Sequence, residues 1–224
     1  MSPRRREAPP GPKAPDLPAD RLRDQILGGV LEAGSPLREE ELAQSYGLSR
    51  HTVRTALARL ADERLLRSEP YRGARVRDFD TAEAIALQEL RGALEAEAAR
   101  ILQQRHGARW PSEVRAPILA SIELLARAEA GGDWLAVTRA HSAMHLALVA
   151  AAGSERITEA YRRLDSETLL LLTQLRLGYP AGSLEPEHRE YFEAVQRGEI
   201  EAVHAHLAQT IELVRSARGE AALD

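Results

Sequence analysis

The sequence has 224 residues, of which 44% are hydrophobic and 29% charged, with a formal net charge of -4. This composition is typical of a globular chain, and the length suffices for one large domain or two small ones. The chain contains no cysteine, which excludes disulfides, thiolate nucleophiles and cysteine metal sites. No apolar run approaches the roughly 20 residues of a membrane helix, and the basic N-terminus lacks the apolar region of a secretory signal, so we expect a cytoplasmic protein.

The charges are unevenly distributed along the chain. Basic residues outnumber acidic ones over 1–78, and the reverse holds over 79–224. This asymmetry favours two parts with different partners. Residues 1–16 are rich in proline and basic side chains and contain nothing that could build a core, so we predict a disordered tail there.

Residues 17–78 carry three short helical patterns followed by two strand patterns. The first helix is predicted from apolar residues that recur at helical spacing and is ended by the turn 34–36; those residues are Leu22, Ile26, Leu27, Val30 and Leu31. A second helix is predicted over Glu39–Tyr46, and a third from the N-cap Ser49 to about Glu63. Two short strands are predicted around residues 70–73. This is the order of a winged helix-turn-helix domain.

The remaining chain shows helical patterns separated by glycines. Six helices are predicted, at roughly 80–106, 112–130, 133–152, 155–177, 186–197 and 199–217. We therefore predict a mainly α protein with a winged helix-turn-helix domain over 17–78 and a linker over 79–83. An all-α bundle of six or seven helices over 84–218 and a tail over 219–224 complete the chain.

The third predicted helix has the chemistry of a helix that reads DNA. Arg50 and Arg54 are four residues apart and share a face, and an arginine can contact guanine bidentately or hold a phosphate. The alternative is an ordinary amphipathic helix with solvated arginines. The full set of candidate DNA contacts is Arg38, Ser49, Arg50, His51, Thr52, Arg54, Arg72 and Gly73.

The helical part carries a candidate metal site. His141 and His145 stand at i and i+4, on one helix face, and His188 begins another helix and could complete the set. Three neutral histidines can bind zinc, nickel or manganese and leave a position for a ligand carboxylate. The alternative is that the histidines only line an effector pocket. Arg91, on an apolar-faced helix, could clamp a ligand carboxylate or pair with Glu95.

Two resemblances give these patterns a family context. Residues 20–77, with the stretches LSRHTVRTALARL and RGARV, resemble the DNA-binding domain of the GntR family of bacterial transcription regulators, which implies DNA contacts for Arg50, Arg54 and Gly73. Glu40 stands where some members have a DNA-contacting arginine.

Residues 84–215 resemble the FCD ligand-binding domain of the FadR-type subgroup, in the stretches LQELRGALEAEAARIL, HSAMHLALVAAAGSERI and EHREYFEAVQRGEIEAVHAHL. Members with a metal site usually have one aspartate and three histidines. His141 stands at the aspartate position, His145 and His188 stand at histidine positions, and Thr210 falls at the last histidine position in an ungapped register. His206, one turn earlier, could take that position only if the helix shifted.

Together these features predict a ligand-responsive DNA-binding transcription regulator and not an enzyme. We expect a homodimer that binds an inverted repeat in operator DNA and a small carboxylate effector. Repression that is released by the effector is implied by the resemblance. The alternatives are an architectural DNA-binding dimer without an effector and a metal-dependent hydrolase.

Overall fold

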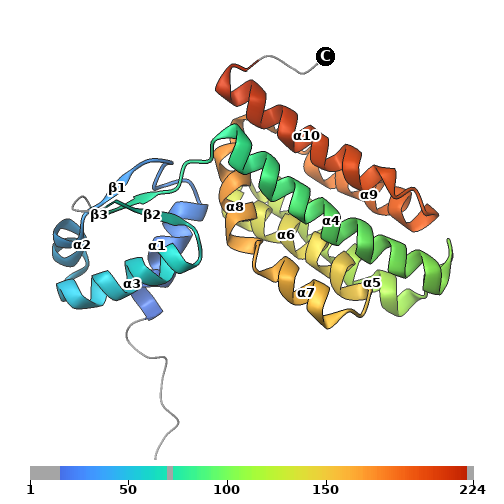
Figure 1. Cartoon of the computed structure of the whole chain (residues 1–224), viewed down its shortest axis with the longest axis horizontal. Coiled ribbons are helices and arrows are strands. Elements are labelled where there is room, and N and C mark those ends of the chain that lie inside the picture. The colour runs from blue at the N-terminus through green and yellow to red at the C-terminus, as the bar shows by residue number, and fades with distance from the viewer. Residues whose placement is uncertain (1–15, 70–72, 221–224) are drawn as a thin grey trace, which may run out of the picture.

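The computed structural model describes residues 16–69 and 73–220, and within these ranges the chain is mainly α, as predicted (Figure 1). The disordered tail expected for 1–16 lies almost wholly outside the described residues; only Asp16 falls inside, as the first residue of a helix. None of the helices in the described ranges is long and apolar enough to cross a bilayer. The elements are α1 (Asp16–Leu27), β1 (Pro36–Leu37), α2 (Glu39–Tyr46), α3 (Arg50–Asp62), β2 (Leu66–Glu69), β3 (Gly73–Val76), α4 (Thr81–His106), α5 (Ser112–Gly131), α6 (Trp134–Ala151), α7 (Glu155–Arg162), α8 (Asp165–Gln174), η1 (Arg176–Gly178), α9 (Leu184–Arg197) and α10 (Glu201–Arg218).

The N-terminal unit consists of α1, α2 and α3 and a small antiparallel sheet with the strand order β1-β3-β2. The two predicted strands are present, with Leu66 opposite Val76. The sequence did not predict β1, which places Leu37 opposite Ala74 on the other edge of β3. Together these elements form the predicted winged helix-turn-helix arrangement.

The first helix is shorter than its apolar pattern suggested. It ends at Leu27 because Gly28 and Gly29 follow, and Gly29 adopts a left-handed φ of 76°. Val30, which was assigned to its inner face, is 72% exposed. The inner face includes Ala19, Leu22, Ile26 and Leu27, all of which are buried.

The linker predicted over 79–83 is mostly structured. Asp80 caps α4 in a capping box, in which its carboxylate accepts from the Glu83 amide at 2.8 Å, so the helix already begins at Thr81. Phe79 is buried in the hydrophobic core. Only the short segment 77–80 joins the two units, close to the end of α10 (Figure 1).

The helical unit confirms five of the six predicted helices, within a few residues at each end. The single helix predicted over 155–177 is instead α7, α8 and the short 3-10 helix η1. The chain turns at Arg163 and Leu164 without a glycine or proline to mark the break.

One hydrophobic cluster continues from the N-terminal unit into the helical unit. It joins Ile26, Leu60 and Phe79 to Leu170 and Leu171 of α8. A second cluster fills the middle of the helical unit between α4, α5, α6, α9 and α10. The N-terminal unit is thus packed against α8 rather than tethered only by its connecting segment.

Candidate nucleic-acid interface and metal centre

α3 has one buried face and one exposed face. Ser49 caps it, because its hydroxyl accepts from the Thr52 amide at 3.1 Å, as the sequence predicted. Val53, Leu57 and Leu60 bury the opposite face. Arg50, His51 and Arg54 are exposed on the other side, and Thr52 is partly exposed next to the cap.

The three exposed arginines of this surface each contact a glutamate. Arg54 pairs with Glu39, Arg50 with Glu40, and Arg38 with Glu41. All three glutamates belong to the first turn of α2. The sequence analysis predicted these arginines as DNA contacts but did not predict their glutamate partners.

The wing is the hairpin formed by β2 and β3, and the structure describes its two strands but not residues 70–72 between them. Arg72, a candidate DNA contact, lies outside the described residues. Gly73 begins β3 with a φ of 87°, and a Cβ there would lie 3.3 Å from the Leu37 carbonyl oxygen. The close approach that requires this glycine is therefore made by the chain's own β1.

Four histidines come together in the helical unit. His141 and His145 on α6, His188 on α9 and His206 on α10 each offer a ring nitrogen, and these nitrogens lie within 4.8 Å of one another. The ring centroids of His141 and His188 are 4.5 Å apart, and those of His188 and His206 are 4.7 Å apart. The structure thus gathers His141, His145 and His188, the three candidate ligands of the sequence analysis, in one cluster.

The register with the FCD family gave the wrong fourth member. Thr210 was expected at the last ligand position, and His206 was expected there only if α10 shifted. In the structure His206 belongs to the cluster, and Thr210 lies one turn further along α10, on the wall of the adjoining cavity. The pair of histidines at 204 and 206 was the available signal, but spacing alone does not show which one faces inward.

Two of the histidines, His145 and His188, are oriented by contacts of the Nδ1 atom, which leaves Nε2 toward the cluster. His145 Nδ1 lies 3.0 Å from a Glu95 oxygen, and His188 Nδ1 lies 2.6 Å from the Leu184 carbonyl oxygen. Their Nε2 atoms, and Nδ1 of His141, are buried and have no hydrogen-bond partner among the described residues. Three orphaned nitrogens that face one another are what a bound cation would satisfy.

The surroundings keep these imidazoles neutral. Burial lowers the pKa of His188 to about 3 and lowers the pKa of His141 and of His206 well below the ordinary value. Burial also lowers the pKa of His145, although Glu95 opposes the effect. A neutral imidazole has a free lone pair, which is the form that binds a metal.

A buried polar network lies beneath the cluster. Glu95 accepts hydrogen bonds from Tyr161 at 2.6 Å and Tyr191 at 2.7 Å, besides its contact with His145. Burial alone would raise the pKa of Glu95, but His145 and Arg91 outweigh burial and hold the pKa well below its usual range. The sequence analysis missed Tyr161 and Tyr191, because no local pattern distinguishes them from core residues.

Arg91 is part of this network. Its guanidinium donates to Gln88 at 2.9 Å, to Glu95 at 3.1 Å and to Tyr161 at 3.3 Å, and its side chain is buried. The ion pair with Glu95, which the sequence offered as an alternative, is therefore present. Arg91 is absent from the described residues that line the adjoining cavity.

A cavity of ≈ 390 Å³ opens onto the cluster, a size within the usual range for small-molecule pockets. His141, His188 and His206 form part of its wall. Most of the other residues on the wall are polar. These other residues are Gly178, Tyr179, Pro180, Glu187, Gln209, Thr210, Glu212, Leu213 and Ser216.

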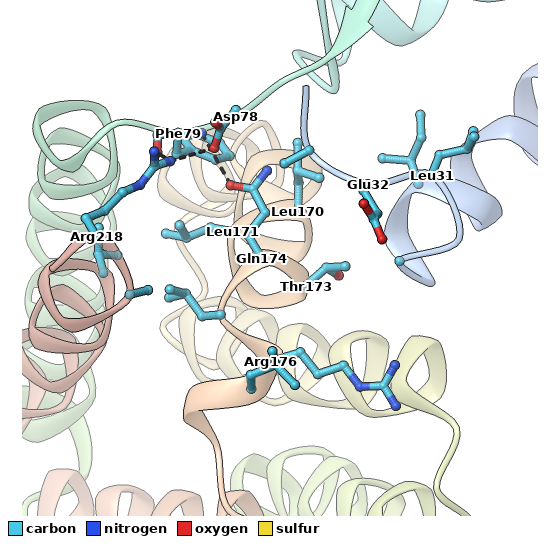
Figure 2. Close-up of a pocket in the computed structure, with 17 residues that line it drawn as sticks. Leu31, Glu32, Asp78, Phe79, Leu170, Leu171, Thr173, Gln174, Arg176 and Arg218 are labelled. Atoms are coloured by element: carbon cyan, nitrogen blue, oxygen red, sulfur yellow. Dashed lines mark hydrogen bonds and ion pairs between the residues drawn. The ribbon is translucent and has the colours of Figure 1, made fainter. Parts of the chain in front are cut away.

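A second cavity, of ≈ 560 Å³, lies between the two units and is bounded by α1, α8, η1 and α10 (Figure 2). Figure 2 shows Gln174 and Arg218 converging on the connecting segment. Gln174 donates to the Arg77 carbonyl oxygen at 2.7 Å and accepts from the Phe79 amide at 3.3 Å. Arg218 donates to Asp78 at 2.5 Å and also to the Phe79 carbonyl oxygen.

Comparison with known proteins places both units. Residues 19–76 match the family described as bacterial regulatory proteins, gntR family, and residues 86–213 match the FCD domain. The chain is 30% identical, over 84% of its length and 83% of the relative, to a probable D-xylose utilization operon transcriptional repressor of Paenarthrobacter nicotinovorans.

Two further similarities agree with this placement. The chain is 29% identical over 64% of its length, and 65% of the relative, to the HTH-type transcriptional repressor GlaR of Escherichia coli. A crystal structure of a GntR transcriptional regulator from Rhodococcus sp. RHA1 shares the fold, with a TM-score of 0.70, 24% identity and coverage of 93% of this chain and 99% of that one. The chain belongs to the GntR family and is a DNA-binding transcription regulator with an FCD domain.

Proposed function

We propose that the protein is a homodimeric, cytoplasmic repressor whose helical unit binds a divalent metal and a small carboxylate effector. The observation that carries the proposal is the four-histidine cluster, with three orphaned nitrogens facing one another beside a cavity that has several polar side chains on its wall. His141, His145, His188 and His206 would hold zinc, nickel or manganese, which when bound would supply an electrophilic site for a carboxylate. Arg91 and Glu95 would support the site from behind.

The cavity favours a hydroxylated acid over a long-chain one. Gln209, Glu212 and Ser216 offer polar atoms along its wall, which suit the hydroxyl groups of a sugar-derived acid. A relative is named for D-xylose utilization, so pentose-derived acids belong among the first compounds to test.

The effector would act on DNA affinity through contacts between the units. α10 carries His206 at the cluster and Arg218 at the connecting segment, and η1 separates the two cavities. A change in the position of α10 would reach the segment that joins α4 to β3. Effector and operator affinities would then be reciprocally coupled.

The proposed DNA recognition is tested by measuring affinity for DNA fragments from the promoters of the gene itself and of its neighbours. In a homodimer, two copies of α3 would read the half-sites of an inverted repeat. Arg50→Ala and Arg54→Ala should each weaken specific binding by roughly 1–3 kcal/mol if the arginine contacts a base bidentately. A protein that binds these fragments no better than random DNA at the same salt concentration would contradict the proposal.

The effector part is tested by adding small carboxylates to metal-loaded protein and measuring operator affinity. The panel comprises sugar acids, hydroxy acids and fatty acids. A hydroxylated monocarboxylate should weaken operator binding, and a dimer that no acid affects would indicate an architectural role instead. Metal-dependent turnover of esters or phosphates would indicate the hydrolase alternative.

A further inference from the structure

Within the described residues, the candidate DNA-reading arginines are all paired with carboxylates. Arg38, Arg50 and Arg54 are matched one to one by the glutamates of the α2 first turn, with Arg38 Nη1 lying 2.7 Å from Glu41 and Arg50 bonded to Glu40. The set of three arginines and three glutamates carries no net charge. General attraction to DNA comes from uncompensated positive charge near the phosphates, so these six side chains together contribute little general attraction.

The contact of Arg54 with Glu39 differs from the other two. Arg54 Nε lies 2.9 Å from Glu39 Oε1, and Arg54 Nη2 lies 2.8 Å from Glu39 Oε2, so the guanidinium is held at two points. This leaves the terminal edge of the guanidinium, made by Nη1 and Nη2, facing away from Glu39. That edge has the two parallel donors that match O6 and N7 of guanine.

The three glutamates share one place in the fold. All three lie in the first turn of α2, where the positive end of the helix dipole stabilises a negative charge. The hydrogen bond from Arg54 also lowers the pKa of Glu39. The Glu39 carboxylate therefore stays charged and close to Arg54.

We propose that Glu39 is a positioning residue that fixes Arg54 for reading a guanine, and that Glu40 and Glu41 screen Arg50 and Arg38 from the DNA phosphates. Recognition by this protein then depends on base contacts more than on general attraction to DNA. The inference builds on the DNA-binding role of α3. It also gives a physical reason for the glutamate at 40, where some members of the family have an arginine.

The test uses isosteric variants that remove one negative charge each. Glu39→Gln, Glu40→Gln and Glu41→Gln are compared with Glu32→Gln, an equal charge change at an exposed residue in the same unit but away from α3. Fluorescence anisotropy measures affinity for an operator duplex and for a random duplex of equal length over a range of salt concentrations. A second operator with the guanine facing Arg54 replaced tests base readout.

Glu40→Gln and Glu41→Gln should bind the random duplex several-fold more tightly than the Glu32→Gln control. The slope of log affinity against log salt should steepen by up to about 0.9 for each new phosphate contact. The preference for the operator should fall. If the two variants bind the random duplex no more tightly than the control, the screening role is overturned. It is also overturned if Glu40→Gln loses affinity for the operator alone, because Glu40 would then read a base.

Glu39→Gln should lose roughly ten-fold in operator affinity and most of its discrimination against the replaced guanine. A Glu39→Gln protein that keeps both would overturn the positioning role. If the unaltered protein shows no preference for any operator, the proposed operator recognition and the role of Glu39 fail together. The screening role of Glu40 and Glu41 is still tested in that case, because it is measured as affinity for the random duplex.

Discussion

At the scale of single residues, Glu95 is the residue on which the histidine site depends most. Its carboxylate is fully buried and accepts from His145, Tyr161, Tyr191 and Arg91. It fixes the ring of His145 so that Nε2 faces the other histidines. It also balances the buried charge of Arg91, which would otherwise be costly.

Glu95→Gln should therefore lower the free energy of unfolding by about 3 kcal/mol, because Arg91 loses its charged partner inside the protein. Chemical denaturation measures the change. Glu97→Gln on the same helix is the matched control, since Glu97 forms an exposed ion pair with Arg100 and its loss should leave stability nearly unchanged. Equal stabilities for the two variants would show that the Glu95 network contributes little.

The buried histidines predict a pH dependence of the metal-free protein. Their pKa values in the folded state lie below the ordinary 6.5, with that of His188 at about 3. Below about pH 6.5 the unfolded chain takes up protons on these rings and the folded chain does not, so stability falls as the pH drops from 7 to 5. The expected loss is about 1.4 kcal/mol per pH unit for each ring that stays neutral.

Denaturation at several pH values in the presence of a chelator checks this dependence. His188→Gln should show a shallower fall, because one of the rings is gone, and His204→Gln, at an exposed residue, should behave like the unaltered protein. The depressed pKa of Glu95 acts only at lower pH, where carboxylates titrate. A stability that stays flat between pH 7 and pH 5 would contradict the assignment.

At the scale of elements, α10 connects the two ends of the proposed regulatory path. Twelve residues separate His206 from Arg218, which is about 18 Å along a helix. The helix ends where Arg218 binds Asp78 and the Phe79 carbonyl oxygen. A helix is stiff over this length, so a displacement at the cluster reaches the connecting segment.

Arg218→Ala should weaken this coupling without affecting the histidine cluster. We expect the effector-induced change in operator affinity, typically about 5- to 150-fold in coupled systems, to fall toward one. Operator affinity is measured with and without effector, and metal content is measured on the same sample. Arg215→Ala, one turn earlier on α10, is the control; a full effector response in the Arg218 variant would exclude this path.

The sequence predicted the elements that have local signals. α2 has the predicted bounds because Gly47 stops it in a left-handed conformation, and α3 begins at Arg50 because the serine before it is a good cap. β1 was missed, since its two residues form a strand only by pairing with β3, and the break at Leu164 carries no glycine or proline. These features depend on contacts between distant parts of the chain.

In the candidate sites, too, local spacing predicted some residues, and contacts between distant parts of the chain determine the others. The spacing of His141 and His145 was enough to place them together, because i and i+4 share a helix face. His206 required the rotation of α10 about its axis, which an ungapped register with a family does not give. The glutamate partners of Arg50 and Arg54 required the packing of α2 against α3, whereas Arg38 and Glu41 are only three residues apart.

At the scale of the whole molecule, the two units are held together by buried contacts. Glu167 of α8 binds Arg64 and Arg77 of the N-terminal unit, and Thr173 donates to the Leu27 carbonyl oxygen at 2.7 Å. The hydrophobic cluster runs through the same region. The relative position of the units is therefore specified, and an effector that changes it must break these contacts.

Glu167→Gln should loosen this docking, because the buried carboxylate that pairs with both arginines becomes neutral. The Phe79 amide reports the change, since Gln174 of the helical unit is its hydrogen-bond partner. We expect faster hydrogen exchange at that amide, while amides in the middle of α4 keep their protection. Unchanged exchange at Phe79 would show that the ion pairs do not hold the units together.

The central claim is that the four histidines form a divalent metal site, and metal content tests it most directly. The protein is purified without a His-tag and without chelator, and the metal per chain is measured by mass spectrometry. We predict close to one zinc, nickel or manganese ion per chain, lost in a His145→Ala/His188→Ala variant and reduced in His206→Ala. A folded, operator-binding protein that stays metal-free even after incubation with each of these ions would contradict the claim.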